Sequence, residues 1–361
     1  MASQPLMLSL LLGAMFGALL QRSRFCFFCV TRDFLEQRDA RGLLGIITAL
    51  AVGLLGYHAV FGLFVPDPSV GRLPPDAHIG PVSWALALAA LAFGGGMTLS
   101  GSCISAHLYR LGEGSLGSLV ALAGVLIGFG LGFATWNSLF LATIQQSPVL
   151  WLPETLGYGG SLALQLAVLA VTAAWLMYRH RAPVAEGATN PGFYQLILRR
   201  RWPTYVGGLA IGMVAVIAYL RVAPLGVTAE LGSVARTLGD QTGLLPERLQ
   251  GLDSFAGCAT AIKETVLSEN GVFIGGLIAA SFGSALIAGD FRIRTVTGRA
   301  AISHLGGGIL MGWGAMTALG CTVGALLSGI MAGAVSGWVF AIFCFLGLWI
   351  GWRVLLKPLH R

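Results

Sequence analysis

The chain has 361 residues, of which 56% are hydrophobic and only 10% are charged, and its mean hydropathy is +0.80. Soluble domains carry about 25% charged residues, so this composition excludes a water-soluble globular protein and predicts a polytopic membrane protein. The formal net charge of +7 does not indicate nucleic acid as a partner, because cytoplasmic loops of membrane proteins are rich in arginine. It is also compatible with an anionic substrate.

Nine apolar segments have about the 20 residues that are needed to cross the hydrocarbon core. They are residues 5–20, 43–64, 83–99, 116–140, 161–178, 203–220, 271–287, 301–319 and 337–355. Glycine interrupts several of them, so we expect some to be re-entrant or partial helices. The chain start has no basic region before its first apolar segment, so we expect that segment to stay in the mature protein. The predicted fold is an all-α polytopic membrane protein in a single domain, 1–361.

Basic side chains predict the orientation of these spans. They gather in the loops 21–41, 179–201 and 292–299 and after the ninth span, where Arg353, Lys357 and Arg361 follow. If the spans alternate in direction, all four groups fall on one side, which should be cytoplasmic. The C-terminus is then inside and the N-terminus outside. The long polar stretch 222–270, which contains Cys258, lies outside and is expected to form short surface helices.

Three of the six cysteines lie in short segments where glycine, serine or arginine should break a helix, and they are Cys26, Cys103 and Cys321. Irregular backbone at membrane depth is tolerated only where it is buried in protein or lines a polar path. The freed amides and helix N-termini at such breaks favour anions, and a thiol adds a weak donor and a polarizable sulfur. The pattern therefore predicts contacts for an anion with a terminal sulfur. A single buried cysteine, such as Cys344, is more often a packing residue.

Two other interpretations of the cysteines are disfavoured. Cys26 and Cys29 form a CxxC pair, but a thioredoxin-like redox motif would need a βαβ context. A zinc site would need more ligands, and we expect no metal and no cofactor. We favour Cys26 over Cys29 because Cys26 directly follows Arg24 and Phe25, whose counterparts recur near Arg292.

The sequence allows more than one role for the charged residues near these cysteines. Arg24 and Arg292 are either inside-facing loop arginines or the basic end of an anion path. Arg110 and Glu113, which follow Cys103, are expected to pair with each other or to lie in solvent.

The chain also contains a weak internal repeat. FGALLQRSRFC, from Phe16, resembles FGSALIAGDFR, from Phe282, and GMTLSGSC, from Gly96, resembles AMTALGC, from Ala315. This predicts two loosely repeated halves, about 1–180 and 200–361, with a site between them near the midplane, as in many transporters. With alternating spans, the loops of Cys103 and Cys321 would approach the midplane from opposite faces.

Four ordered motifs of the chain resemble the YeeE/YedE family of bacterial inner-membrane proteins, which take up thiosulfate or related sulfur compounds. The motifs are QRSRFC at 21–26 with its following Arg32-Asp33 pair, the segment from Cys103 through YRLGEGSLGS, DFRIR at 290–294, and the GILMGWGA…GC element at 308–321. The likeness runs through nearly the whole chain.

The resemblance implies an hourglass-shaped helical protein whose short helices and loops meet at a central constriction. It implies that Cys26, Cys103 and Cys321 pass thiosulfate inward through transient contacts, with Gly101 and Gly320 in the two glycine–cysteine breaks. Ser102 stands where the family usually has glycine, and it would add a hydroxyl donor or narrow the path. Leu319 replaces a small residue. The family also suggests a cytoplasmic sulfur-carrier (TusA-like) or rhodanese-like partner.

The sequence thus predicts a thiosulfate permease rather than an enzyme. One alternative is a transporter of another sulfur or selenium compound. A second is a membrane sulfurtransferase that forms a cysteine persulfide, which would need an activated thiolate; Arg24 near Cys26 is its sole hint. A third is a structural subunit with packing cysteines. No intramembrane carboxylate pair indicates a coupling proton.

Overall fold

The computed structural model describes residues 3–64, 68, 73, 78–181, 199–221, 225–241, 243, 245–252 and 268–356. Within these ranges the regular structure is helical and contains no strand beyond isolated bridges, which confirms the all-α prediction. Cys258, Lys357 and Arg361 lie outside the described residues.

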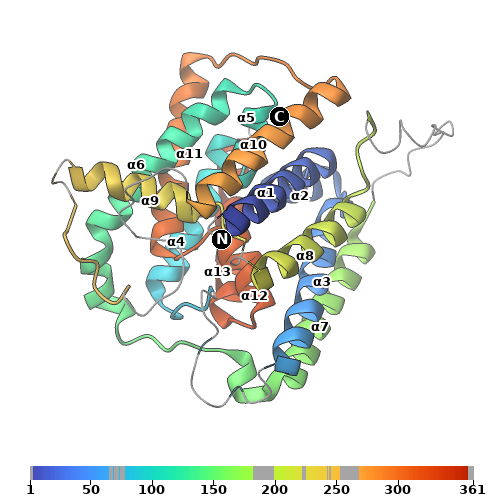
Figure 1. Cartoon of the computed structure of the whole chain (residues 1–361), viewed down its shortest axis with the longest axis vertical. Coiled ribbons are helices and arrows are strands. Elements are labelled where there is room, and N and C mark those ends of the chain that lie inside the picture. Colours follow the sequence, from blue (N-terminus) through green and yellow to red (C-terminus); the bar gives the residue numbers. More distant parts are fainter. Residues whose placement is uncertain are drawn as a thin grey trace.

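Figure 1 shows how the helices follow one another along the chain. Their bounds are α1 (Ser3–Ser23), α2 (Phe27–Gln37), α3 (Arg41–Phe64), α4 (Trp84–Ser100), α5 (Ile104–Gly112), α6 (Leu116–Leu139), η2 (Phe140–Ile144), α7 (Leu152–Arg179), α8 (Thr204–Arg221), α9 (Thr228–Gln241), α10 (Glu269–Ala288), α11 (Gly298–Thr317), η4 (Thr322–Ser328), α12 (Gly329–Met331), α13 (Val335–Gly351) and η5 (Trp352–Leu356).

The predicted spans are confirmed. Among the described residues, eight helical segments are long and apolar enough to cross a membrane, and a ninth is formed if α11 and the bent segment after it count as one span. That segment, Thr322–Met331, is bent by 42° from α11, as expected of a broken or re-entrant element. The fifth span begins earlier than predicted, because α7 already starts at Leu152 and is kinked at Gly157.

The helices pack as two groups on either side of a central pair (Figure 1). One group contains α4, α6, α11 and α13, and the other contains α3, α7 and α8. The pair α1 and α10 lies between them, with α1 against α8 and α10 against α5. The long helices therefore form walls around the short helices α2, α5 and η4.

Glycine allows the closest of these contacts. A Cβ atom on Gly128 of α6 would collide with the carbonyl of Ile309 in α11, and one on Gly312 of α11 would collide with the carbonyl of Val125. Lipid tails are as apolar as leucine, so helices in a membrane gain their affinity from close backbone approach between small residues.

The helices that carry the repeated sequence segments are packing partners. Gly13 and Gly17 of α1 face Phe273 and Leu277 of α10 in the same order, so this pair is parallel. In α4 and α11, Gly96 faces Gly307 while Ala89 faces Gly314, so that pair is antiparallel. The breaks before Cys103 and Cys321 therefore follow opposite ends of one antiparallel pair.

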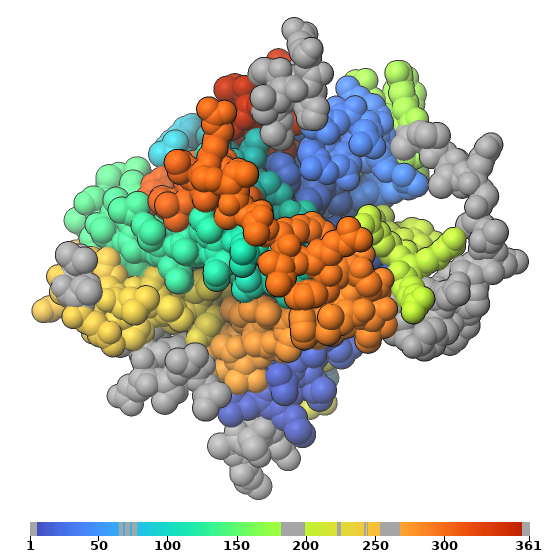
Figure 2. All heavy atoms as spheres, turned by 90° about the horizontal axis from the view of Figure 1, so that it is seen from above, coloured from blue at the N-terminus to red at the C-terminus, as the bar shows by residue number. Residues whose placement is uncertain are grey.

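The arginine-rich loops meet at one end of the bundle, shown from above in Figure 2. The Arg22 guanidinium donates to the carbonyl of Arg200 at 2.6 Å, and Trp352 donates its indole N–H to Glu36 at 3.1 Å. The orange segment that begins at Asp290 lies across the teal-coloured turn at 112–116, where the amide of Arg294 donates to the carbonyl of Gly114 at 2.9 Å. We call this the basic end.

The stretch between α8 and α10 differs from the prediction of short surface helices. Its described helix, α9, has 14 residues and packs against α6. Arg236 of α9 is only 3% exposed, and its guanidinium lies 5.7 Å from the ring centre of Phe133. One face of α9 is therefore buried, and there Nη2 of Arg236 donates to the carbonyls of Pro246 and Glu247.

Candidate functional site

Each of the three predicted cysteines occupies the position just before a short helix. Cys26 precedes α2, Cys103 precedes α5 and Cys321 precedes η4, which continues into α12. The carbonyl of each cysteine accepts the first intrahelical hydrogen bond, from Val30, His107 and Ala325 respectively, which is the geometry of an N-cap. All three side chains are buried, with exposures of 0%, 1% and 1%. The three thiols therefore lie at the positive ends of three helices.

The three breaks share one backbone design. The residue two positions before each cysteine has a left-handed conformation, with φ of 52° at Arg24, 75° at Gly101 and 54° at Leu319. This conformation stops the preceding helix and turns the chain so that the next helix begins at the cysteine. Glycine adopts it without steric cost, but other residues do not, so at Arg24 and Leu319 the surrounding packing must hold the backbone in place.

The three helix starts border one narrow cavity, which we call the constriction. Its volume is about 20 Å³, and residues next to each break line it: Phe25 and Phe27 beside Cys26, Cys103 itself, and Thr322 and Val323 after Cys321. A single water needs roughly 10–15 Å³ of such volume. The constriction is therefore closed to anything larger than one or two waters in this structure.

Two of the three thiols are in contact and the third stands apart. The Sγ atoms of Cys103 and Cys26 are 3.8 Å apart, and Cys103 Sγ is 3.3 Å from the hydroxyl of Ser105. Cys321 Sγ instead accepts from the amide of Val323 at 3.4 Å and shares a hydrogen bond with Thr228 of α9. The fold brings Cys26 and Cys103 together, while Cys321 reaches the constriction through the residues that follow it.

The glycine and serine residues beside these cysteines take distinct roles. The carbonyl of Gly101 accepts a hydrogen bond from Arg110 at 3.3 Å. Gly320 fits tightly against the start of η4, where an added Cβ would lie 2.7 Å from the amide nitrogen of Ala325. Ser102 is fully buried, and its hydroxyl has no hydrogen-bond partner in the described part of the chain. A buried hydroxyl without a partner is rare, and this one adjoins Cys103.

Arg24 belongs to a partly buried ion-pair cluster. Its guanidinium lies 2.9 Å from Glu113, whose side chain is 2% exposed, and 3.5 Å from Asp290. The amide of Gln21 donates to the same two carboxylates at 3.2 Å. The cluster joins the ends of α1, α5 and α10. Arg292 lies outside it, because its side chain is exposed and its backbone amide donates to the carbonyl of Glu113.

The expectation that Arg110 and Glu113 pair with each other or lie in solvent is wrong. Glu113 is held by Arg24, while Arg110 turns toward α2 and donates to the sulfur of Cys29 at 3.1 Å. The two side chains leave the end of α5 in different directions because each meets a partner from α1 or α2. No sequence signal specifies that choice, since the partners are more than 80 residues away.

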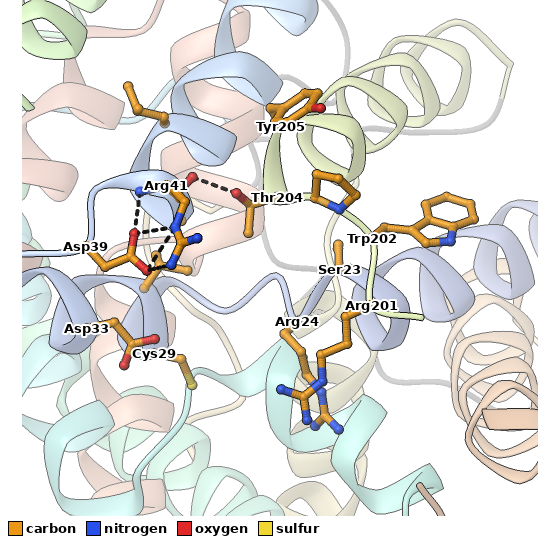
Figure 3. A pocket seen from close by; sticks show the side chains of 14 residues that line it. Ser23, Arg24, Cys29, Asp33, Asp39, Arg41, Arg201, Trp202, Thr204 and Tyr205 are labelled. Carbon is orange, nitrogen blue, oxygen red and sulfur yellow. Dashed lines mark hydrogen bonds and ion pairs between the residues drawn. The ribbon is translucent and has the colours of Figure 1, made fainter. Parts of the chain in front are cut away.

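A larger cavity opens at the basic end, and we call it the vestibule. It has a volume of about 660 Å³ and is lined by Ser23, Arg24, Cys29, Val30, Asp33, Asp39, Arg41, Gly42, Leu44, Arg201, Trp202, Pro203, Thr204 and Tyr205 (Figure 3). The Arg41 guanidinium forms a bidentate ion pair with Asp39, in which the Nη2–Oδ2 distance is 2.6 Å. This pairing lowers the pKa of the Asp39 carboxyl. Figure 3 shows the side chains of Arg24 and Arg201 directed to the same side of the vestibule.

Comparison with known proteins identifies the family. The model of the sulphur transport family matches residues 22–350, which is most of the chain. The chain belongs to the sulphur transport family. This match includes all three breaks, and it confirms the resemblance that the sequence motifs indicated.

Two relatives are similar over almost the full length. The thiosulfate transporter TsuA of Escherichia coli (strain K12) is 27% identical over 367 residues, which cover 98% of this chain and 95% of the relative. A protein of the same name from Spirochaeta thermophila is 29% identical over 350 residues, covering 94% and 96%. The probable transporter YedE of E. coli matches a shorter part, at 36% identity over 93 residues, or 26% and 23% of the two chains. All are named as transporters, in agreement with the prediction of a transport protein rather than an enzyme.

Proposed function

We propose that this membrane protein is a permease of the bacterial inner membrane that takes up thiosulfate, or a closely related sulfur anion, into the cytoplasm. The observation that carries this proposal is the placing of Cys26, Cys103 and Cys321 at the starts of three short helices around one constriction. The two full-length relatives named as thiosulfate transporters support the choice of substrate.

The chemistry of the three breaks suits thiosulfate, a dianion with three oxygens and one terminal sulfur. Helix N-termini carry partial positive charge and unpaired N–H groups, which stabilise the oxygens. The thiols offer weak S–H donors and polarizable sulfur to the terminal sulfur. The hydroxyl of Ser102, which is buried without a partner, supplies a further donor next to Cys103. Weak contacts of this kind let an anion leave each site as easily as it enters, which conduction requires.

The fold supports one order of the three contacts. Cys321 comes after the end of α11 that is remote from the basic end, while Cys26 comes two residues after Arg24 at the basic end. We therefore place Cys321 first, Cys103 in the middle and Cys26 last on the inward path. The constriction has room for about one water, so each passage requires Phe25 and Phe27 to move aside.

We further propose that the basic end faces the cytoplasm. Three arginine-rich loops meet there, near the described end of the last span, and such clusters remain on the cytoplasmic side during insertion. This places the C-terminus inside and the N-terminus outside. A cytoplasmic sulfur-carrier (TusA-like) or rhodanese-like protein is then the proposed acceptor, and faster uptake into vesicles that enclose such a protein would support this part of the proposal.

The proposal is tested by growth on thiosulfate as the sole sulfur source. We expect Cys103→Ala and Cys321→Ala to abolish growth although both variants reach the membrane in normal amounts. Cys344→Ala is the matched control, because Cys344 is equally buried but packs in α13, and it should grow normally. Normal growth of both test variants would refute the relay, whereas growth on another sulfur or selenium compound alone would change the substrate.

A further inference from the structure

We infer that Cys29 and Arg110 form a fourth contact of this pathway, at which a sulfur-terminated anion leaves Cys26 and enters the vestibule. The inference rests on the proposed function, because it assigns the release step of the same path. It adds a binding site that the three-cysteine relay does not contain.

The first argument is the arrangement of the thiols. Cys26 is the N-cap of α2 and Cys29 follows it by three residues, a spacing that places both on one face of the helix. Cys26 also contacts Cys103 at 3.8 Å. The three sulfur atoms thus form a continuous series from the constriction, which Cys103 lines, to the vestibule, which Cys29 lines.

The second argument is the charge of Arg110. Its guanidinium donates to Cys29 Sγ at 3.1 Å and to the carbonyl of Gly101 at 3.3 Å. Among the described residues no carboxylate pairs with it, because Glu113 is bound by Arg24. Arg110 is partly buried, and a cation withdrawn from water without an anionic partner is costly. An ionisable residue inside a membrane span usually marks a substrate path. An arriving anion at Cys29 would supply the missing negative charge.

The third argument is the charge balance of the vestibule. Arg41 is matched by Asp39, Asp33 is matched by Arg32 at 2.8 Å, and Arg24 is matched by Glu113 and Asp290. Arg201 lines the vestibule without a carboxylate partner in the described part of the chain. The positive charges without a carboxylate partner are therefore those of Arg201 in the vestibule and of Arg110 beside Cys29. They would attract a small anion that leaves Cys26 and enters the vestibule.

The first test measures the uptake of sulfur-labelled thiosulfate into proteoliposomes by the wild type, Cys29→Ser, Cys29→Ala and the control Cys344→Ser. Hydrogen bonds to charged partners are among the stronger ones, so we expect both Cys29 variants to lose about tenfold or more in uptake rate, while Cys344→Ser retains the wild-type rate. Wild-type rates in both Cys29 variants would overturn the inference and leave the proposed function intact. A wild type that transports no thiosulfate would instead refute the proposed function.

The second test does not depend on uptake. An anionic methanethiosulfonate reagent is added to the purified protein, and the modified cysteine is identified by mass spectrometry. We expect Cys29 to react faster than the fully buried Cys26 and Cys103, thiosulfate to slow this reaction more than sulfate does, and Arg110→Gln to slow it in the absence of either anion. Equal effects of thiosulfate and sulfate, or no effect of Arg110→Gln, would contradict the inference.

Discussion

At the residue scale, the site depends on the backbone conformation of the residue two positions before each cysteine. Arg24, Gly101 and Leu319 share a left-handed conformation, although nothing in their chemistry is alike. The glycine among them was visible in the sequence as a helix breaker. The other two were not, because an arginine or a leucine takes this conformation only where the surrounding fold enforces it.

Gly101 provides a direct test of this design. A Cβ atom added there would meet nothing within 4 Å, so the effect of Gly101→Ala comes from its φ of 75° alone. We expect the free energy of unfolding in detergent to fall by about 1–2 kcal/mol. Gly95→Ala is the matched control, because Gly95 lies in the regular part of α4 and its Cβ would also meet nothing; it should be neutral or slightly stabilising. Equal effects of the two changes would contradict a conformational role for Gly101.

The sequence predicted only some of the residue contacts in the site. The cysteines at the breaks could be found because glycine and serine next to them interrupt apolar runs. The contact of Arg110 with Cys29 could not, since it spans 81 residues of sequence and depends on how α5 packs beside α2. The same holds for Arg24, whose carboxylate partners are 89 and 266 residues away.

The elements divide into long spans, which the sequence located, and short helices, which it did not. A run of about 20 apolar residues has few alternatives to crossing the membrane, so all nine predicted spans have a matching helix. The helices α2 and α5 have only 11 and 9 residues and contain charged side chains. Their amphipathic sequences would suit a surface, and they are stable in the centre because α1, α3, α6 and α10 pack around them.

At the element scale, the contact of α6 with α11 is sensitive to a single methyl group. Gly128→Ala would push a Cβ atom into the carbonyl of Ile309, whereas Gly130→Ala would meet nothing within 4 Å. Overpacking typically costs about 1–3 kcal/mol, so we expect Gly128→Ala to lower the midpoint of thermal unfolding in detergent. Gly130→Ala should leave it unchanged or raise it slightly. A reversed order of the two variants would contradict the packing described for this pair.

At the scale of the whole molecule, one end collects the arginine-rich loops and the vestibule. Its orientation can be tested with two single cysteines, Gln146→Cys at the opposite end and Arg292→Cys at the basic end, both at exposed positions. In a Cys29→Ser/Cys258→Ser background, which removes the vestibule thiol, we expect a membrane-impermeant maleimide to label Gln146→Cys in intact cells and Arg292→Cys only after the membrane is opened. The reverse pattern would place the basic end outside and reverse the proposed direction of the path.

The two cavities differ greatly in size. The vestibule has about 660 Å³, while the constriction has about 20 Å³. A protein that conducts a dianion needs such a barrier, because a permanently open pore of this width would also pass water and other small ions. The contacts of thiosulfate with the thiols and helix starts would then offset the free energy of widening the constriction.

The central claim is that Cys103 contacts a sulfur anion as it crosses the constriction. The most direct measurement is the uptake of sulfur-labelled thiosulfate into proteoliposomes by the wild type, Cys103→Ser and Cys344→Ser at equal protein content. The account predicts uptake by the wild type and by Cys344→Ser and its loss in Cys103→Ser. Uptake by Cys103→Ser at the wild-type rate would contradict it.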